Sequence, residues 1–328
     1  MRSAVPAASR ASLLLLVALA FRPAQAEWLQ GEQSIMGTRC VVELWSEDRV
    51  RGQTAIDAVF AEFRRIDALM STYKPESELS RVNAGAATAP VPVSRELYDL
   101  LATSIGYSEL TGGAFDVTYA SVGYLYDYRS RVHPDAAAIA AALPGIDYRH
   151  IELVPATRSV RFRRPGVRVD LGGIAKGHAV DRGIAVLQEL GIDRAMVNAG
   201  GDTRIIGDRL GRPWVVGIRH PDDEHKVVLR IPLTDTAMST SGDYERYFEE
   251  DGIRYHHILD PKTGRSAGKL RSVTVIAPTA TRTDALTKSV FVMGAEDGIR
   301  FIDTLGDVDA IAVTPEGKVL YSKGLAPP

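Results

Sequence analysis

Apolar residues recur along the chain with two different spacings, and each spacing predicts a different element. Apolar and polar residues alternate over residues 38–45, which predicts a strand with one buried face. Apolar residues recur every three or four positions over residues 56–70, which predicts a helix packed on the core. A second helix is predicted over residues 94–110, because Ser94 is a favourable N-cap and glycines at 112 and 113 end the pattern.

Short strands account for most of the remaining pattern. The predicted strands are residues 151–154, 160–162, 167–171, 195–198, 214–218, 227–231 and 272–277, followed by a hairpin of 310–313 and 318–321. Further helices are predicted from a glycine-rich junction at 172–173 to about Leu190, and over residues 284–293 and 295–305. Most strands follow one another across short turns rather than across helices. The chain is therefore predicted to be α+β, with mixed, largely antiparallel sheets flanked by helices, and not a doubly wound nucleotide-binding fold.

The first 26 residues have the pattern of a targeting segment. Arg2 and Arg10 precede a short apolar core, residues 13–21, and small residues stand at the cleavage positions up to Ala26. The apolar core is too short for a permanent membrane anchor. We therefore expect residues 1–26 to be a cleaved signal peptide, and residues 27–328 to form one soluble periplasmic domain, single or made of two closely packed lobes.

Composition narrows the possible partners. A formal net charge of −2 and a pI near 6.4 give no electrostatic reason to expect nucleic acid or an anionic membrane as a partner. The one cysteine, Cys40, cannot form an internal disulfide and lies in a strand pattern, so we expect it in the core.

The junction at residues 170–177 is the richest candidate for chemistry. An apolar run ends in Asp170, and paired glycines lead into a helical pattern that contains Lys176. Glycines let the backbone approach an anion, amides at a helix start favour negative charge, and a lysine adds a cation. The spacing matches neither the P-loop nor the Gly-x-Gly-x-x-Gly dinucleotide pattern. A phosphate site is one interpretation, and a tight turn with a solvated lysine is the other.

Other segments rich in polar residues and glycine fall at the ends of predicted elements, where functional loops tend to lie. They are Met36-Gly37-Thr38, Ser71-Thr72-Tyr73, Gly113-Ala114-Phe115-Asp116, Asn198-Ala199-Gly200-Gly201-Asp202, Ser241-Gly242-Asp243-Tyr244, His257-Ile258-Leu259-Asp260-Pro261 and Asp284-Ala285-Leu286. Together with the glycine junction, their order and spacing over residues 36–294 resemble the ApbE family, the flavin transferases that move FMN from FAD onto a protein hydroxyl. The resemblance implies a T-fold-like α+β architecture.

The resemblance also implies which residues contact FAD. It assigns Met36, Tyr73, Ala114, Phe115 and Asp116 to a flavin and adenosine pocket, and Asp170, Lys176 and Ile258 to contacts further along the bound FAD. Aromatic rings can pack on a flavin, carboxylates can accept from ribose or ring N–H groups, and a lysine can neutralise phosphate. For Phe115, simple core packing is the alternative interpretation.

The same resemblance implies a Mg²⁺ site and a base. The metal ligands would be the backbone carbonyl of Gly173, the side chain of Asp284 and the backbone carbonyl of Thr287. His257 is the candidate for proton removal from the attacking hydroxyl, with Asp284 as a second candidate.

One residue departs from the family pattern. Four residues after Asp284 the family commonly carries a threonine that completes the metal site, and this chain has Lys288 there. At that spacing on a helix both side chains share a face, so an ammonium would repel a divalent cation, unless it points to solvent.

Three functions follow as hypotheses. The first is transfer of FMN from FAD to a Ser or Thr hydroxyl of an exported flavoprotein, with release of AMP. The second is an FAD pyrophosphatase, in which water replaces the hydroxyl. The third is a periplasmic protein that binds FAD without cleaving it. Lys288 favours this third hypothesis, whereas His257 and Asp284 favour the two enzymes.

Overall fold

The computed structural model describes residues 26–220 and 223–325. Residues 1–25 of the predicted signal peptide lie outside this part of the chain, so cleavage after Ala26 stays a prediction. No described helix is both long enough and apolar enough to cross a membrane.

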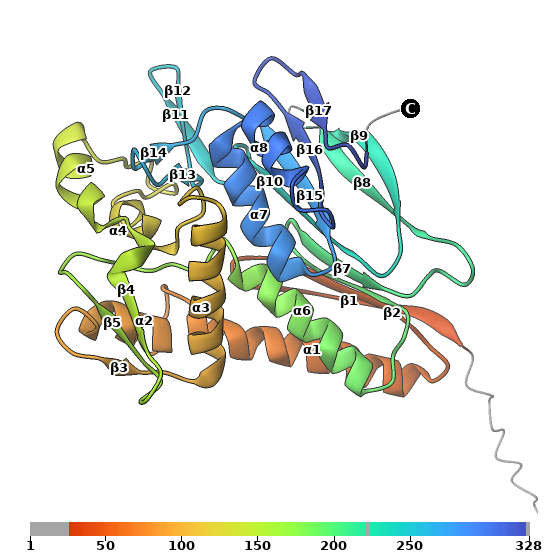
Figure 1. The fold of residues 1–328 in the computed structure, drawn as a ribbon. Coiled ribbons are helices and arrows are strands. Elements are labelled where there is room, and N and C mark those ends of the chain that lie inside the picture. The colour runs from red at the N-terminus through yellow and green to blue at the C-terminus, as the bar shows by residue number, and fades with distance from the viewer. Residues whose placement is uncertain (1–25, 221–222, 326–328) are drawn as a thin grey trace, which may run out of the picture.

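An eight-stranded open sheet forms the centre of the fold (Figure 1). Its strands, in spatial order, are β1 (Glu27–Ile35), β2 (Thr38–Ser46), β6 (Ala195–Ala199), β7 (Asp202–Ile206), β10 (Ala237–Gly242), β15 (Ser272–Ala277), β16 (Asp309–Val313) and β17 (Val319–Tyr321). Every neighbouring pair is antiparallel. The α+β prediction with antiparallel sheets is therefore confirmed.

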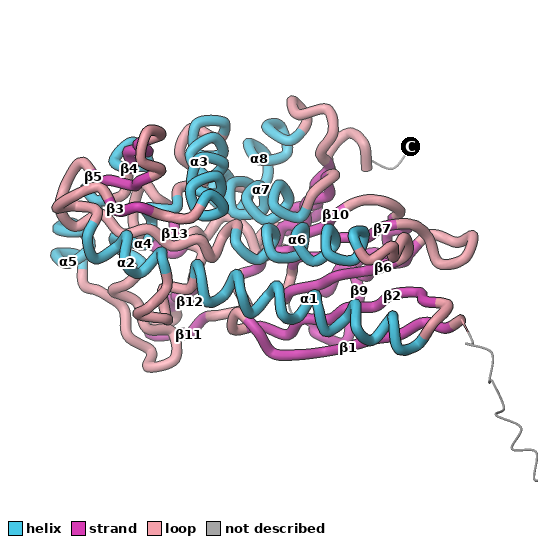
Figure 2. Tube along the Cα trace, turned by 90° about the horizontal axis from the view of Figure 1, so that it is seen from below, coloured by secondary structure: helices cyan, strands magenta, loops and turns pink. Residues whose placement is uncertain are grey.

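Helices cover one face of this sheet (Figures 1 and 2). They are α1 (Arg49–Met70), α6 (Ala175–Glu189), α7 (Ala280–Met293) and α8 (Ala295–Ile302). The apolar spacing that predicted α1 matches its buried face, which includes Phe60 and Phe63. Cys40 is fully buried under these helices, as expected.

A hairpin of β8 (Trp214–His220) and β9 (Asp223–Leu233) covers the other face. Trp214 and Ile231 of the hairpin pack with Ile205 of β7 and Met238 of β10 in a separate apolar cluster. Successive side chains of β7 and β10 point to opposite faces of the sheet, so one set packs against the hairpin and the other against the helices.

The remaining elements lie beside the large sheet and the helices and hairpin that cover it (Figure 1). They are α2 (Glu78–Gly85), β3 (Val91–Pro92), α3 (Arg95–Leu110), η1 (Val117–Tyr119), α4 (Ala120–Gly123), α5 (Ala136–Ala142), η2 (Leu143–Gly145), η3 (Tyr148–His150), β4 (Ile151–Val154), β5 (Ser159–Phe162), β11 (Tyr247–Glu250), β12 (Ile253–His256), β13 (Leu259–Asp260) and β14 (Arg265–Ser266). Ser94 caps α3 as predicted, since its hydroxyl accepts from the amide of Leu97. Buried Leu97 and Phe162 join the same apolar cluster as Phe63, so these elements share a core with the large sheet.

The strand predicted at residues 167–171 is not formed. The segment has no regular secondary structure and pairs with no strand, although its apolar residues are buried. Val169 instead exchanges two hydrogen bonds of 2.8 Å with the side-chain amide of Asn83, and the amide of Arg168 donates to Ser121 Oγ at 2.9 Å. Side chains thus satisfy the backbone groups that a neighbouring strand would otherwise satisfy.

Helix α7 begins at Ala280, four residues before the predicted start. Asp181 on α6 caps it, because its carboxylate accepts from the amides of Ala280 at 2.9 Å and Thr281 at 2.8 Å. Gly177, one turn earlier on α6, brings the two helices into direct backbone contact. A Cβ at that position would lie 2.2 Å from the carbonyl oxygen of Ala280 and 2.8 Å from Cβ of Asp284.

Gly177→Ala is expected to lower the free energy of unfolding by about 1–3 kcal/mol, because the added methyl group pushes α6 and α7 apart. Urea unfolding at neutral pH measures the change. Gly106→Ala is the matched control, since Gly106 lies within α3 and a Cβ there meets no atom within 4 Å. This control should raise the free energy of unfolding by about 0.5–1 kcal/mol. A similar effect of the two substitutions would contradict the close contact.

Candidate active site

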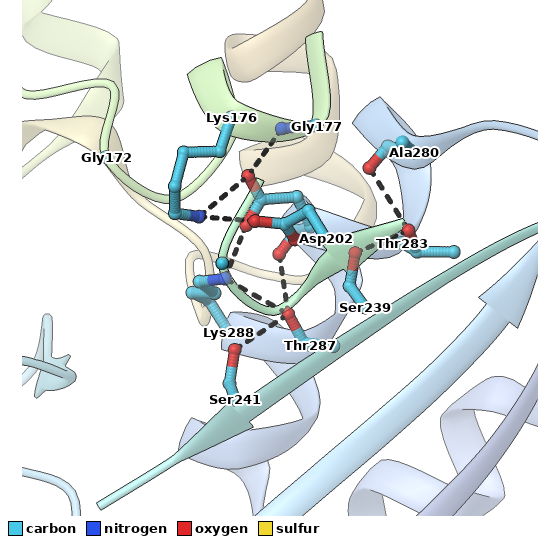
Figure 3. A network of polar contacts seen from close by, with 12 residues as sticks. Gly172, Lys176, Gly177, Asp202, Ser239, Ser241, Ala280, Thr283, Thr287 and Lys288 are labelled. Atoms are coloured by element: carbon cyan, nitrogen blue, oxygen red, sulfur yellow. Dashed lines mark hydrogen bonds and ion pairs between the residues drawn. The ribbon is translucent and has the colours of Figure 1, made fainter. Parts of the chain in front are cut away.

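Two lysines and two aspartates meet where α6, α7 and β7 come together (Figure 3). Lys176 Nζ lies 2.5 Å from Asp202 Oδ2 and 3.4 Å from Asp284 Oδ2. Lys288 Nζ donates to Asp284 Oδ1 from the next turn of α7. The side chain of Asp284 has no exposed area, while those of Lys176 and Lys288 are 21% and 18% exposed. We call these four residues the Lys–Asp cluster.

Local structure explains why each member points inward. Asp202 and Arg204 alternate along β7 and face α6, where they pair with Lys176 and Asp181 respectively. Asp284 lies against the N-terminus of α6, and its Oδ2 accepts from the amide of Gly177 at 3.0 Å. A carboxylate at this position is favoured by the helix dipole.

Hydroxyl groups fix the face of α7 that carries the cluster. Ser239 and Ser241 alternate on β10, and their hydroxyls bond to those of Thr283 at 2.6 Å and Thr287 at 3.0 Å. The Thr287 hydroxyl in turn donates to the carbonyl of Asp284 at 2.7 Å. These pairs set the rotation of α7 relative to the sheet, so that Asp284 faces α6.

Charges within the cluster oppose the cost of burial. Burial alone would raise the pKa of Asp284, but Lys176 and Lys288 together hold that pKa below its usual value. Burial and the neighbouring charge of Asp284 raise the pKa of Asp202, whose Oδ1 is buried without a hydrogen-bond partner. Burial opposes the charge of Lys176, yet the two carboxylates raise its pKa above the usual value. With all four groups ionised, the cluster carries two positive and two negative charges.

The residues predicted to bind Mg²⁺ do not fit a divalent cation in this arrangement. Both carboxylate oxygens of Asp284 already face an ammonium group, as described above. Thr287 lies inside α7, where backbone carbonyls accept intrahelical hydrogen bonds. Gly173 does lie beside Lys288, since a Cβ on Gly173 would be 3.5 Å from Lys288 Cγ. Across residues 26–220 and 223–325, no group of three or more His, Cys, Asp and Glu side chains could hold a metal ion.

The two adjacent histidines have different surroundings. His256 is buried, its Nε2 donates to the carbonyl of Ala267 at 2.9 Å, and its Nδ1 accepts from the amide of Ile258 at 3.3 Å. His257, the predicted base, is partly exposed, and its Nδ1 is buried without a partner. Burial first, and then the charges of Lys288 and Arg246, lower the pKa of His257 to about 3. The ring is therefore neutral at pH 7, with a free Nδ1, but the same surroundings make it a weaker base than an exposed imidazole.

Asp170, a predicted FAD contact, ties the glycine junction to two loops. Its Oδ2 accepts from the hydroxyl of Thr72 at 2.8 Å, and its Oδ1 accepts from Tyr119 at 3.0 Å and from the amide of Gly172 at 2.7 Å. The junction is thus a turn held by its own aspartate, immediately before α6.

Asp116, the other predicted carboxylate contact, has a structural role that the sequence did not reveal. Its Oδ1 accepts from the amide and the hydroxyl of Thr118, at 2.8 and 2.6 Å, and its Oδ2 accepts from the amide of Tyr148 at 2.8 Å. Burial raises the pKa of Asp116. These three donors fix the orientation of the carboxylate and leave about one of its acceptor positions for a ligand.

The apolar residues assigned to FAD differ in exposure. Tyr73 is 87% exposed, whereas Phe115 and Ile258 are 4% exposed. Ala114 is half-buried beside the apolar cluster of α7. Phe115 packs edge-on against Tyr107, with ring centroids 6.2 Å apart, and reaches Gly173.

Met36 stands in the two-residue turn between β1 and β2, with a φ of 54°. This left-handed backbone conformation is uncommon outside glycine, and the following residue, Gly37, shares it with a φ of 70°. The Met-Gly-Thr motif is therefore a tight hairpin turn that holds the Met36 side chain partly buried.

Comparisons with known proteins decide the family. A family model described as the ApbE family matches residues 36–312. The chain belongs to the ApbE family. It is 34% identical over 310 residues to a FAD:protein FMN transferase of Treponema pallidum (strain Nichols), covering 89% of this chain and 86% of that protein.

Solved structures agree with this assignment. The crystal structure of the ApbE protein of Thermotoga maritima is similar, with a TM-score of 0.85 and 34% identity over 91% of this chain and 98% of that one. The flavin transferase ApbE of Vibrio cholerae is similar with a TM-score of 0.81 and 32% identity over the same shares. The resemblance drawn from the motifs is confirmed, and this chain has the ApbE fold.

The sequence alone does not reveal the roles of Asp202 in the Lys–Asp cluster or of Ser241 beside it. Asp202 ends the Asn-Ala-Gly-Gly-Asp motif and Ser241 begins Ser-Gly-Asp-Tyr, but neither motif indicates a partner. In the fold, Asp202 begins β7 and its side chain is buried. The partner of Asp202, Lys176, is 26 residues away and becomes visible only in the fold.

The neutral state of His256 should make the protein less stable in acid. Its folded pKa is about 4, below the usual value, so between pH 6.5 and 4 the unfolded chain binds a proton that the folded chain does not. Lowering the pH from 7 to 5 should therefore cost about 1–2 kcal/mol of stability through this residue.

Urea unfolding of the wild type and His256→Gln at pH 7 and pH 5 measures this cost. The variant should lose less stability between the two values than the wild type does. NMR of the wild-type ring should show no protonation of His256 above pH 5. A ring that titrates near 6.5 would contradict the burial argument.

Proposed function

We propose that this chain transfers FMN from FAD to the hydroxyl of a Ser or Thr in an acceptor flavoprotein and releases AMP. Relatives that match nearly the whole chain are named FAD:protein FMN transferases. The observation that carries the proposal is the Lys–Asp cluster. It places two ammonium groups, Lys176 and Lys288, beside the glycine turn that precedes α6.

The proposed step exchanges one phosphorus–oxygen bond for another. The acceptor oxygen forms a bond to the phosphorus on the riboflavin side of the pyrophosphate. The bond from that phosphorus to the bridging oxygen breaks, and AMP leaves with the electron pair. The hydroxyl proton passes to the neutral imidazole of His257. Such reactions depend mainly on positioning and on positive charge near the phosphate oxygens.

The chain's own residues supply both requirements. Lys176 is already oriented by Asp202, so its charge is in place before substrate binds. The turn at Gly172–Gly173 lets a phosphate approach the backbone closely. Met36, Tyr73, Ala114, Phe115, Asp116, Asp170 and Ile258 stay the predicted contacts to FAD. The exposed ring of Tyr73 is the one with free area for stacking. We assign no step to Mg²⁺, because the arrangement at Asp284 does not accommodate it.

We further propose that the protein acts in the periplasm after cleavage at Ala26. Support comes from the basic start, short apolar core and small residues of the N-terminal segment. The acceptor would then be another exported flavoprotein.

Replacing the proposed base should separate catalysis from binding. His257→Gln is expected to slow FMN transfer by about 10²–10⁴-fold, the usual contribution of a general base, while FAD affinity stays within a factor of about two. The purified mature protein would be incubated with FAD and a peptide that contains an acceptor Ser or Thr, and modified peptide quantified by mass spectrometry. His150→Gln is the control, because His150 lies in η3 and bonds to the carbonyl of Pro144.

The products distinguish the three hypotheses. Modified peptide and AMP support the transferase. FMN and AMP without modified peptide would indicate a pyrophosphatase. Intact FAD retained by the protein would indicate a binding protein.

A further inference from the structure

The ammonium of Lys288 is held at Asp284 and does not point into solvent. Its side chain is 18% exposed, it donates to Asp284 Oδ1, and it lies 3.3 Å from the hydroxyl of Thr287. Its stem passes close to Gly173, because a Cβ added to that glycine would lie 3.5 Å from Lys288 Cγ. The carboxylate, the hydroxyl and the glycine turn therefore hold this lysine on three sides.

A divalent cation and this ammonium cannot share the same carboxylate. An ion bonded to Asp284 would be within contact distance of Lys288 Nζ and close to Lys176 Nζ, and like charges at that separation repel strongly in a buried site. The only other carboxylate in the Lys–Asp cluster, Asp202, pairs with Lys176 through Oδ2 at 2.5 Å, and its unpartnered Oδ1 would give a divalent cation a single protein oxygen.

Each ammonium keeps one donor for a substrate. A lysine has three N–H groups. Lys176 uses two on Asp202 and Asp284, and Lys288 uses two on Asp284 and Thr287. The third N–H of each has no partner among the described residues, and a phosphate oxygen is the strong acceptor that fits it.

We infer that Lys288 takes the place of the divalent cation, so that this chain transfers FMN without a metal. The inference rests on the proposed function and specifies its chemistry. Lys288 and Lys176 bind the pyrophosphate oxygens and neutralise the charge that develops as AMP leaves. The bonds that form and break, and the transfer of the proton to His257, are those given above, and no metal takes part.

Three variants and two readouts test this inference. Lys288→Met removes the ammonium without adding an oxygen, Lys288→Thr adds a hydroxyl at the same position, and Lys318→Thr removes an exposed lysine in the turn before β17 as a charge control. FMN transfer is measured in EDTA and in excess Mg²⁺. Binding of MnCl₂ is measured separately by electron paramagnetic resonance, in the presence of FAD and against FAD alone.

The wild type and Lys318→Thr should transfer FMN in EDTA within about twofold of their rate in Mg²⁺. Lys288→Met and Lys288→Thr should lose at least about tenfold in EDTA, as expected for losing a charge aimed at the transition state. Lys288→Thr should recover in Mg²⁺ and bind Mn²⁺, whereas the wild type should bind none beyond the FAD blank.

The inference would be overturned if transfer by the wild type stops in EDTA and returns with Mg²⁺. It would also be overturned if the wild type binds Mn²⁺ and Asp284→Asn removes that binding. If no protein modifies the peptide under any condition, the proposed function fails instead. The Mn²⁺ measurement still decides the role of Lys288 in that case, because it does not depend on activity.

Discussion

The site depends on neutralising one fully buried carboxylate, Asp284. An unpaired charge in such a position would be costly, so its two oxygens must meet donors or cations. Helix α6 provides the amide of Gly177 and the ammonium of Lys176, while α7 provides Lys288. Asp202 then balances Lys176 from the start of β7. One electrostatic requirement thus brings two helices and a strand to a single point.

This requirement explains features that would otherwise look unrelated. A side chain at Gly177 would displace α7, so a glycine stands where Asp284 must approach α6. Asp181 lies one turn further along α6 and caps the start of α7. This cap holds the same two helices together at a second point. The positive charges are consequently in position before any substrate arrives, which is the condition under which electrostatic stabilisation of a transition state is most effective.

Patterns within single elements could be predicted from the sequence, and contacts between distant elements could not. The spacing of apolar residues revealed α1, and Ser94 revealed the start of α3, because both signals are local. The segment at 167–171 has the apolar pattern of a strand because its apolar residues are buried, yet the partner of Val169 is a side chain, Asn83, 86 residues away. Comparison with the family motif shows that Lys288 stands where a metal-binding threonine is common. Only the fold shows that the Lys288 ammonium donates to Asp284 instead of pointing into solvent.

The most direct test of this account is a crystal structure of the wild-type protein grown with FAD and MnCl₂, with anomalous scattering recorded at the manganese edge. The account predicts no anomalous peak at Asp284, the Lys288 ammonium in contact with its carboxylate, and both lysines within hydrogen-bond distance of pyrophosphate oxygens. An anomalous peak bonded to Asp284, with Lys288 displaced, would contradict it.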